Sequence, residues 1–270
     1  MLRMCYTKGT TQGGLDMFFD THAHLDNKRF DVDREEVIAS LKECGISLVL
    51  NAACDMPSCY TTLELTRTWD FIYGSVGVHP HSADEMTDAD LETIRSLARE
   101  PKIQAIGEIG LDYHYDFSPR DVQKARFCDQ LTLARELKMP VIIHDREAHE
   151  DCLNILRDFS DLKVVYHCFS GSVEYAKEIT NLGFYMSFGG SATFANAKTA
   201  PEVIRRMPIE RLMLETDCPY LTPVPYRGRR NSPAYIPNIA EKFAEYLQMP
   251  VDELGRITYE NGKRFFEIED

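Results

Sequence analysis

The sequence predicts an α/β fold, a single-domain (β/α)8 TIM barrel. Eight short hydrophobic runs recur along the 270 residues, and amphipathic helical patterns separate them. Several runs are hydrophobic at consecutive positions, which is typical of parallel strands covered on both faces. With 44% hydrophobic residues the chain suits one large domain as well as two small ones. We favour one domain because no linker, low-complexity tract or repeat divides the chain.

The expected strands follow one another at the spacing of a barrel. In chain order they are residues 17–22, 47–52, 71–78, 103–108, 141–144, 163–167, 184–188 and 212–217. An open doubly wound sheet is the alternative, and it would normally carry a Gly-rich phosphate turn after its first strand. The sequence DTHAH stands in that place, so the barrel is favoured.

Helix signals lie between the strands. Asp33 and Glu36 resemble a capping box, and Gly45 suits the end of the helix that they begin. A second helix is expected over residues 121–137, and a final one over 252–266 outside the barrel. The expected buried face of the second helix consists of Ala125, Cys128, Leu131, Leu133 and Ala134.

Composition limits the possible functions. The net charge of −13 argues against binding nucleic acid by charge alone, although bound cations could supply local positive charge to a nuclease. The eight cysteines include no Cys-x-x-Cys pair, which indicates a reduced, cytoplasmic chain. No apolar run reaches membrane-spanning length. Residues 1–16 lack a signal-peptide core and are expected to be an extension before a barrel over 17–270. We expect a monomer with no obligate protein partner.

Six candidate metal ligands each fall where an expected strand ends. They are His22, His24, Glu108, His144, His167 and Asp217. The carboxyl ends of barrel strands meet at one face, so these side chains should converge there. His22 and His24 are two residues apart and therefore face the same way on a strand. Imidazoles and carboxylates together suit a divalent metal ion.

Each candidate taken alone has an ordinary explanation. A His-x-His pair occurs by chance, and one glutamate is more often part of a salt bridge. His144 or His167 alone would be a hydrogen-bonded core histidine, and Asp217 could cap the next segment. All six at the same end of successive strands favour the ligand interpretation. Glu108 has two oxygens with which to bridge two metals, and Asp217 could serve as ligand and general base.

The chain closely resembles the TatD family of metal-dependent deoxyribonucleases from Met17 to its end. The motifs are 20–26 (DTHAHLD), 77–81 (GVHPH), 107–112 (GEIGLD), 143–144 (IH), 167–171 (HCFSG), 215–221 (ETDCPYL) and 230–233 (RNSP). The resemblance implies two divalent ions, which could be Zn, Mn or Mg. One would be held by His22, His24, Glu108 and Asp217, and the other by Glu108, His144 and His167. Glu108 would take the place of the carboxylated lysine that bridges the metals in other barrel families.

Further candidates surround the expected ligands. His79 could bind a third ion or a phosphate oxygen, or make a structural hydrogen bond. Asp112 could orient a ligand, and Ser170 could open a helix whose N–H groups accept a phosphate. Arg229 and Arg230 lie in the most basic run, ahead of Asn231 in the RNSP motif, and could grip a nucleic-acid backbone or be solvated.

Three functions follow from this pattern. The first is a deoxyribonuclease that cleaves DNA, with ends or single strands favoured, through a metal-activated water. The second uses the same dinuclear site on a carboxylic ester or amide, such as an aminoacyl-tRNA ester or a small lactone. The third is a barrel that has lost catalysis and acts as a binding partner. The complete ligand set makes the third function the weakest interpretation.

Overall fold

The computed structural model describes residues 17–269, and its strands form a nearly closed parallel barrel. Within these residues eight strands pair in chain order from β1 to β8. They are β1 Phe18–Ala23, β2 Ile46–Ala52, β3 Ile72–Val76, β4 Ile103–Asp112, β5 Val141–Arg146, β6 Val164–Tyr166, β7 Tyr185–Phe188 and β8 Leu212–Leu214. A parallel bridge between Ala23 and Cys218 brings the two ends of the sheet together. The predicted fold class is confirmed, whereas the expected extension over residues 1–16 lies outside the described residues.

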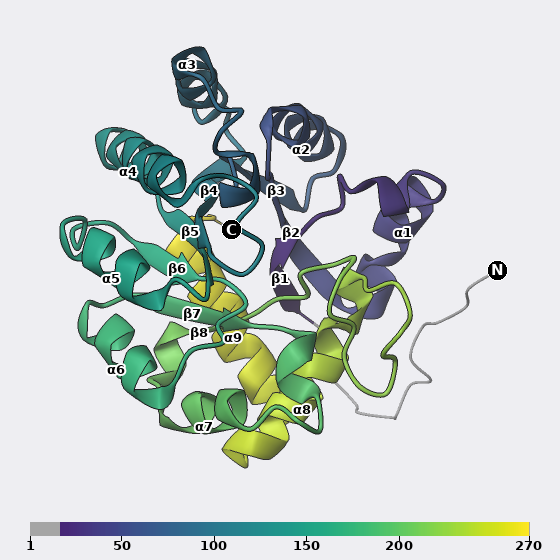
Figure 1. The fold of residues 1–270 in the computed structure, drawn as a ribbon. Helices are drawn as coiled ribbons and strands as arrows, with labels where there is room; N and C mark the ends of the chain where they lie inside the picture. Colours follow the sequence, from purple (N-terminus) through teal and green to yellow (C-terminus); the bar gives the residue numbers. More distant parts are fainter. Residues whose placement is uncertain (1–16, 270) are drawn as a thin grey trace.

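A helix follows each strand and covers the outside of the barrel (Figure 1). The helices are α1 Arg34–Ser40, α2 Met56–Thr68, α3 Asp88–Leu97, α4 Arg120–Leu137, α5 His149–Arg157, α6 Val173–Asn181, α7 Thr199–Arg206, α8 Ile236–Leu247 and α9 Val251–Phe266. The two expected long helices correspond to α4 and α9. The predicted face of α4 was wrong in part, because Ala125 is exposed and Phe127 is buried. No helix within residues 17–269 has the length and apolar content needed to cross a membrane.

The capping box expected at Asp33 does not form. Asp33 precedes α1, but its side chain caps no backbone N–H of the helix. Its two carboxylate oxygens instead accept hydrogen bonds of 2.7 and 2.6 Å from the guanidinium of Arg230. Gly45 does end the following short helix over residues 42–44, with a left-handed φ of 82°. The Asp33 carboxylate is therefore paired with an arginine distant in sequence and does not cap α1.

The final helix closes the amino-terminal end of the barrel. Alternate strand residues such as Phe19, Leu50 and Ile142 form an inner cluster, which Phe265 and Phe266 of α9 join. The rings of Phe19 and Phe266 lie 5.9 Å apart. The helix thus lies outside the strands, as expected, while its last turn packs against the barrel interior.

Several ligand-bearing strands differ in length from the prediction. β4 and β5 continue past Glu108 and His144, whereas β6 ends just before His167. β8 ends three residues before Asp217, whose backbone turns to a φ of 54°. The N–H of Asp217 donates to the carbonyl of His22 at 2.9 Å. Contact with β1, rather than continuation of β8, therefore places this carboxylate at the barrel mouth.

Gly110 permits the close approach of β4 to β5 beside His144. It has a φ of +145°, and a Cβ atom built there would lie 2.0 Å from the His144 carbonyl oxygen. The two residues are partners in the strand register. Only glycine fits this position without displacing the backbone that carries His144.

We predict that Gly110→Ala destabilises the barrel more than Gly228→Ala. Gly228 also has a left-handed φ, of +88°, but a Cβ there would meet nothing within 4 Å. Gly228→Ala is therefore the control that introduces the backbone strain without a steric clash. Because overpacking adds a steric cost, the free energy of unfolding should fall by about 1–3 kcal/mol more for Gly110→Ala. Denaturant unfolding measures both variants, and equal losses would contradict the steric argument.

Candidate metal centre

The six predicted ligands come together at the carboxyl end of the barrel. His22 and Glu108 lie in β1 and β4, His144 lies in β5, and His24, His167 and Asp217 follow β1, β6 and β8. His22, His24, Glu108 and His167 are buried, whereas His144 and Asp217 are partly exposed. Residues separated by nearly two hundred positions thus form one cluster. The cluster is thus largely buried, with two of its six members partly exposed.

Glu108 lies at the centre of the cluster. Its Oε1 atom is 2.8 Å from His144 Nδ1 and 2.7 Å from His167 Nε2. Its Oε2 atom is 3.3 Å from His22 Nε2 and 3.7 Å from His24 Nε2. Each carboxylate oxygen therefore faces its own pair of histidines.

Asp217 completes the group around Oε2 of Glu108. Its Oδ1 atom is 3.3 Å from His24 Nε2, and the Nε2 atoms of His22 and His24 are 3.2 Å apart. Ligand atoms at 2.1 Å from a tetrahedral metal would be about 3.4 Å from one another. These separations are thus close to those that a bound cation requires.

Hydrogen bonds on the outer nitrogens indicate which ring atoms face the cluster. His24 Nδ1 lies 2.8 Å from the Ala52 carbonyl and must donate to it. His144 Nε2 lies 3.0 Å from the Asp112 carboxylate and donates to that group. In a neutral imidazole the other nitrogen then carries a lone pair directed at Glu108 or Asp217. Two acceptors face each other in such a contact, so a cation or an extra proton must lie between them.

The electrostatics of the cluster favour positive charge at its centre. Burial opposes a charge on His167, yet the neighbouring Glu108 raises the pKa of His167 well above its usual value. Burial also opposes ionisation of Glu108, but the surrounding histidines hold the pKa of Glu108 well below its usual range. Similarly, the contact with His24 outweighs burial and lowers the pKa of Asp217. Metal cations can supply the positive charge that these carboxylates attract.

His79 and Asp112 lie beside the cluster. His79 Nε2 is 3.5 Å from Glu108 Oε1, and burial together with His144 lowers the pKa of His79 to about 3. A neutral imidazole at this position retains a lone pair. Asp112 accepts hydrogen bonds from His144 and from His81, the latter at 2.9 Å. Asp112 therefore orients the ring of a candidate ligand.

The other four predicted residues were candidates for substrate or supporting contacts. Ser170 is exposed and does not open α6, because Ser172 caps that helix with its hydroxyl. The buried Asn231 donates from its amide to the carbonyls of Thr216 and Tyr220. Arg230 is committed to Asp33, and the guanidinium of Arg229 lies 5.6 Å from the ring centre of Tyr226.

Sequence reasoning missed three residues near the ligands. His81 contacts Asp112, and its position two residues after His79 repeats the spacing of His22 and His24. Cys54 Sγ lies 3.6 Å from His24 Nδ1. The buried Glu215 accepts from the backbone N–H of Cys168 at 2.6 Å and lies 3.7 Å from His167 Nδ1. Its place two residues before Asp217 is the signal that could have identified it.

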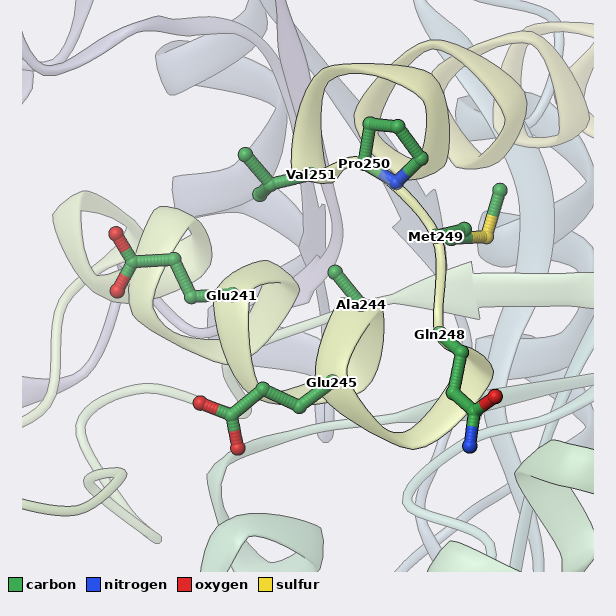
Figure 2. Close-up of a pocket in the computed structure, with 7 residues that line it drawn as sticks. All are labelled: Glu241, Ala244, Glu245, Gln248, Met249, Pro250 and Val251. Carbon is green, nitrogen blue, oxygen red and sulfur yellow. The ribbon is translucent and has the colours of Figure 1, made fainter.

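A separate pocket lies at the joint between α8 and α9. Figure 2 shows its lining residues, which are Glu241, Ala244, Glu245, Gln248, Met249, Pro250 and Val251. Two carboxylates and several apolar side chains contribute to it. None of the six candidate ligands lines this pocket, so it is distinct from the metal centre.

A (β/α)8 barrel with histidines and carboxylates at its carboxyl end defines a class of metal-dependent hydrolases. The chain belongs to the TatD family within that class, because residues 19–267 match the family described as TatD related DNase.

Relatives with high coverage support this assignment. The chain is 46% identical over 254 residues to the uncharacterized metal-dependent hydrolase YabD of Bacillus subtilis, covering 93% of this chain and 100% of the relative. It is 34% identical to the 3'-5' ssDNA/RNA exonuclease TatD of Klebsiella pneumoniae, covering 93% and 98% of the two chains. The crystal structure of the TatD homolog YJJV from Escherichia coli K12 superposes with a TM-score of 0.88 at 28% identity, covering 93% and 98%. The chain is a TatD-type metal-dependent hydrolase.

We predict that Asp112→Asn weakens metal binding without unfolding the chain. An amide accepts a weaker hydrogen bond from His144 Nε2 than a carboxylate does, so the ligand becomes less basic and less well oriented. Loss of such an outer partner typically lowers metal affinity by about 10–100-fold. Calorimetric titration with Mn²⁺ measures the change. Asp116→Asn, on the exposed loop that follows β4, is the control, and equal affinities in the two variants would refute the role.

Proposed function

We propose that the chain is a nuclease that hydrolyses phosphodiester bonds of DNA, with single strands and chain ends favoured. The observation that carries the proposal is the central Glu108 carboxylate, whose two oxygens face two separate histidine pairs. Paired cations bridged in this way suit phosphodiester displacement. The relative from Klebsiella pneumoniae that is named an ssDNA/RNA exonuclease supports this choice of substrate.

In this proposal two divalent cations share the cluster. His22, His24, Asp217 and Glu108 would hold one of them. Glu108, His144 and His167 would hold the other. Mixed nitrogen and oxygen ligands suit Zn²⁺ or Mn²⁺, whereas Mg²⁺ prefers oxygen ligands alone.

The side chains then have separate tasks in hydrolysis. Bound cations would neutralise charge on the scissile phosphate and lower the pKa of the attacking water. Asp217 is ionised, because the contact with His24 lowers its pKa, and its side chain is 15% exposed at the mouth. Asp217 can therefore accept the proton from that water. Asp112 and Asn231 act on this chemistry indirectly, by holding His144 and the loop that carries Asp217.

The charge of the chain supports flexible substrates. A net charge of −13 repels a polyanion away from the cations. A strand end can place one phosphate at the mouth while fewer of its other phosphates approach the acidic surface. Arg229 and Arg230, on the loop after β8, are the proposed contacts with the strand, and Arg230 is also paired with Asp33.

The proposal includes a cytoplasmic, monomeric enzyme. Within residues 17–269 the cysteine side chains are thiols rather than disulfides, as is usual in a reducing compartment. The residues proposed to hold the cations all come from one chain, as a monomeric enzyme requires.

We predict that Glu108→Gln lowers the tightly bound metal from two equivalents per chain to one or none. The amide lacks the negative charge and the second anionic oxygen that a bridge requires. Elemental analysis after dialysis measures the stoichiometry, and circular dichroism verifies the fold. Glu147→Gln, at an exposed carboxylate that contacts His114, is the control. Two retained equivalents in Glu108→Gln would show that Glu108 is not the bridge.

We predict that the metal-loaded chain degrades single-stranded DNA faster than duplex DNA or an aminoacyl-tRNA ester, compared side by side. Asp217→Asn should slow this cleavage by about 10²–10⁴-fold, because an amide cannot accept the proton. Product analysis by electrophoresis measures the rates, with metal content determined for each variant.

Two outcomes would contradict this assignment. Preferential hydrolysis of the aminoacyl ester would show that the same site acts on carbonyl substrates instead of phosphodiesters. Near-normal cleavage by Asp217→Asn with its metal retained would exclude Asp217 as the base.

A further inference from the structure

We propose that Phe117, supported by Tyr115, stacks against a nucleobase of the strand that is being cleaved. The inference rests on the proposed nuclease function and adds the means by which the strand is held next to the metal centre. The loop between β4 and α4 would then bind a base, in addition to the phosphate binding proposed for the metal centre.

The first observation is a pair of exposed, stacked aromatic rings. Phe117 is 64% exposed and Tyr115 is 48% exposed. Their ring centres are 5.2 Å apart, and their planes differ by 23°. Single exposed aromatic residues are common on protein surfaces. Two rings stacked on one another on a short loop form an ordered flat surface instead.

The second observation is that neighbouring groups hold this pair in place. The guanidinium of Arg146 lies 4.7 Å from the ring centre of Tyr115. The His81 ring meets Tyr115 and Phe117 edge-on, with ring centres 5.3 and 4.8 Å away. Tyr115 is thus held between groups, while Phe117 is the more exposed of the two rings. Phe117 therefore offers the larger exposed aromatic surface for stacking.

The third observation is that the pair is connected to the candidate metal centre. His81 Nε2 lies 2.9 Å from Asp112 Oδ2, and the same oxygen lies 3.0 Å from His144 Nε2. The ring centres of His81 and His144 are 6.1 Å apart. Only His81 and Asp112 therefore separate the stacked rings from a candidate ligand. A base on Phe117 would belong to a nucleotide close to the scissile phosphate.

A nucleobase is the occupant that best fits these groups. Every base has a flat π face, and stacking on aromatic side chains is a general way to hold single strands. Stacking needs no net positive charge, which suits a chain whose net charge is −13. A paired base in a duplex is already stacked, so the same surface selects unpaired nucleotides. A protein partner would need a much larger apolar patch than two rings.

The test combines a side-chain deletion with a base deletion. Single-stranded oligonucleotides carry one abasic nucleotide, which is moved stepwise away from the cleaved end. With the wild-type enzyme, one abasic position next to the scissile bond should raise KM by about 5- to 150-fold, the range expected for losing one stacked base. Phe117→Ala should raise KM for the intact oligonucleotide by a similar factor. Phe117→Ala combined with the abasic position should raise KM no more than either change alone.

Two matched variants show whether aromaticity is the cause. Phe117→Trp keeps a stacking face and should retain a low KM, whereas Phe117→Leu keeps apolar bulk and should behave as Phe117→Ala does. Tyr60→Ala removes a similarly exposed ring, 53% exposed on α2, and should leave KM unchanged. The inference is overturned if Phe117→Ala binds intact strands normally, or if its abasic penalty equals that of the wild type. A Phe117→Leu variant that keeps the wild-type KM would also overturn the inference.

A binding measurement keeps this inference separable from the nuclease proposal. The Asp217→Asn chain, loaded with Mn²⁺, is titrated into an oligonucleotide with 2-aminopurine at the sensitive position. Stacking should quench the fluorescence, and adding Phe117→Ala should remove the quenching. If the wild type cleaves DNA but the quenching does not depend on Phe117, the inference that a base stacks on Phe117 is wrong. The nuclease proposal is then unaffected. If the wild type cleaves no nucleic acid, the nuclease proposal fails whatever the fluorescence shows.

Discussion

The buried carboxylate of Glu108 is the interaction on which the rest of the site depends. Its side chain is 3% exposed, and an isolated charge at that depth would be strongly destabilising. Five histidines from four different parts of the barrel surround it, so shared positive charge must offset its burial. That requirement links β1, β5 and the segments after β3 and β6 to β4, because each must deliver a nitrogen to the carboxylate that β4 carries. The strands converge there only if the barrel is nearly closed.

Closure between the first and last strands is therefore a second constraint. The N–H and hydroxyl of Thr216 donate to the buried Asp20 carboxylate at 2.9 and 2.5 Å. Asn231 holds the carbonyl of Thr216, and Arg230 ties the same loop to Asp33. These contacts join residues almost two hundred positions apart. They place Asp217 beside His24, although β8 itself stops at Leu214.

The sequence was sufficient to predict the barrel and the convergence of the six candidate ligands. Hydrophobic runs mark the strands locally, and the ligands occur beside them in short motifs. The capping box at Asp33 could not be assessed locally, because its competitor, Arg230, is distant in sequence. The burial of Phe127 in place of Ala125 depends on how α4 turns against the sheet. Contacts of His81 and Glu215 with the ligands likewise arise only once separate strands meet.

The amino end of the barrel contributes packing, and the carboxyl end contains the candidate ligands. Phe265 and Phe266 fill the amino end with apolar contacts, so the carboxyl end can contain polar groups that contribute little to packing. The overall negative charge then has a consequence for catalysis. Positive charge would be concentrated where the proposed cations meet Glu108, while the net charge of −13 repels a polyanion. A rim that holds bases by stacking on Phe117 would complement this arrangement, because stacking adds affinity without adding the cations that would attract duplex DNA.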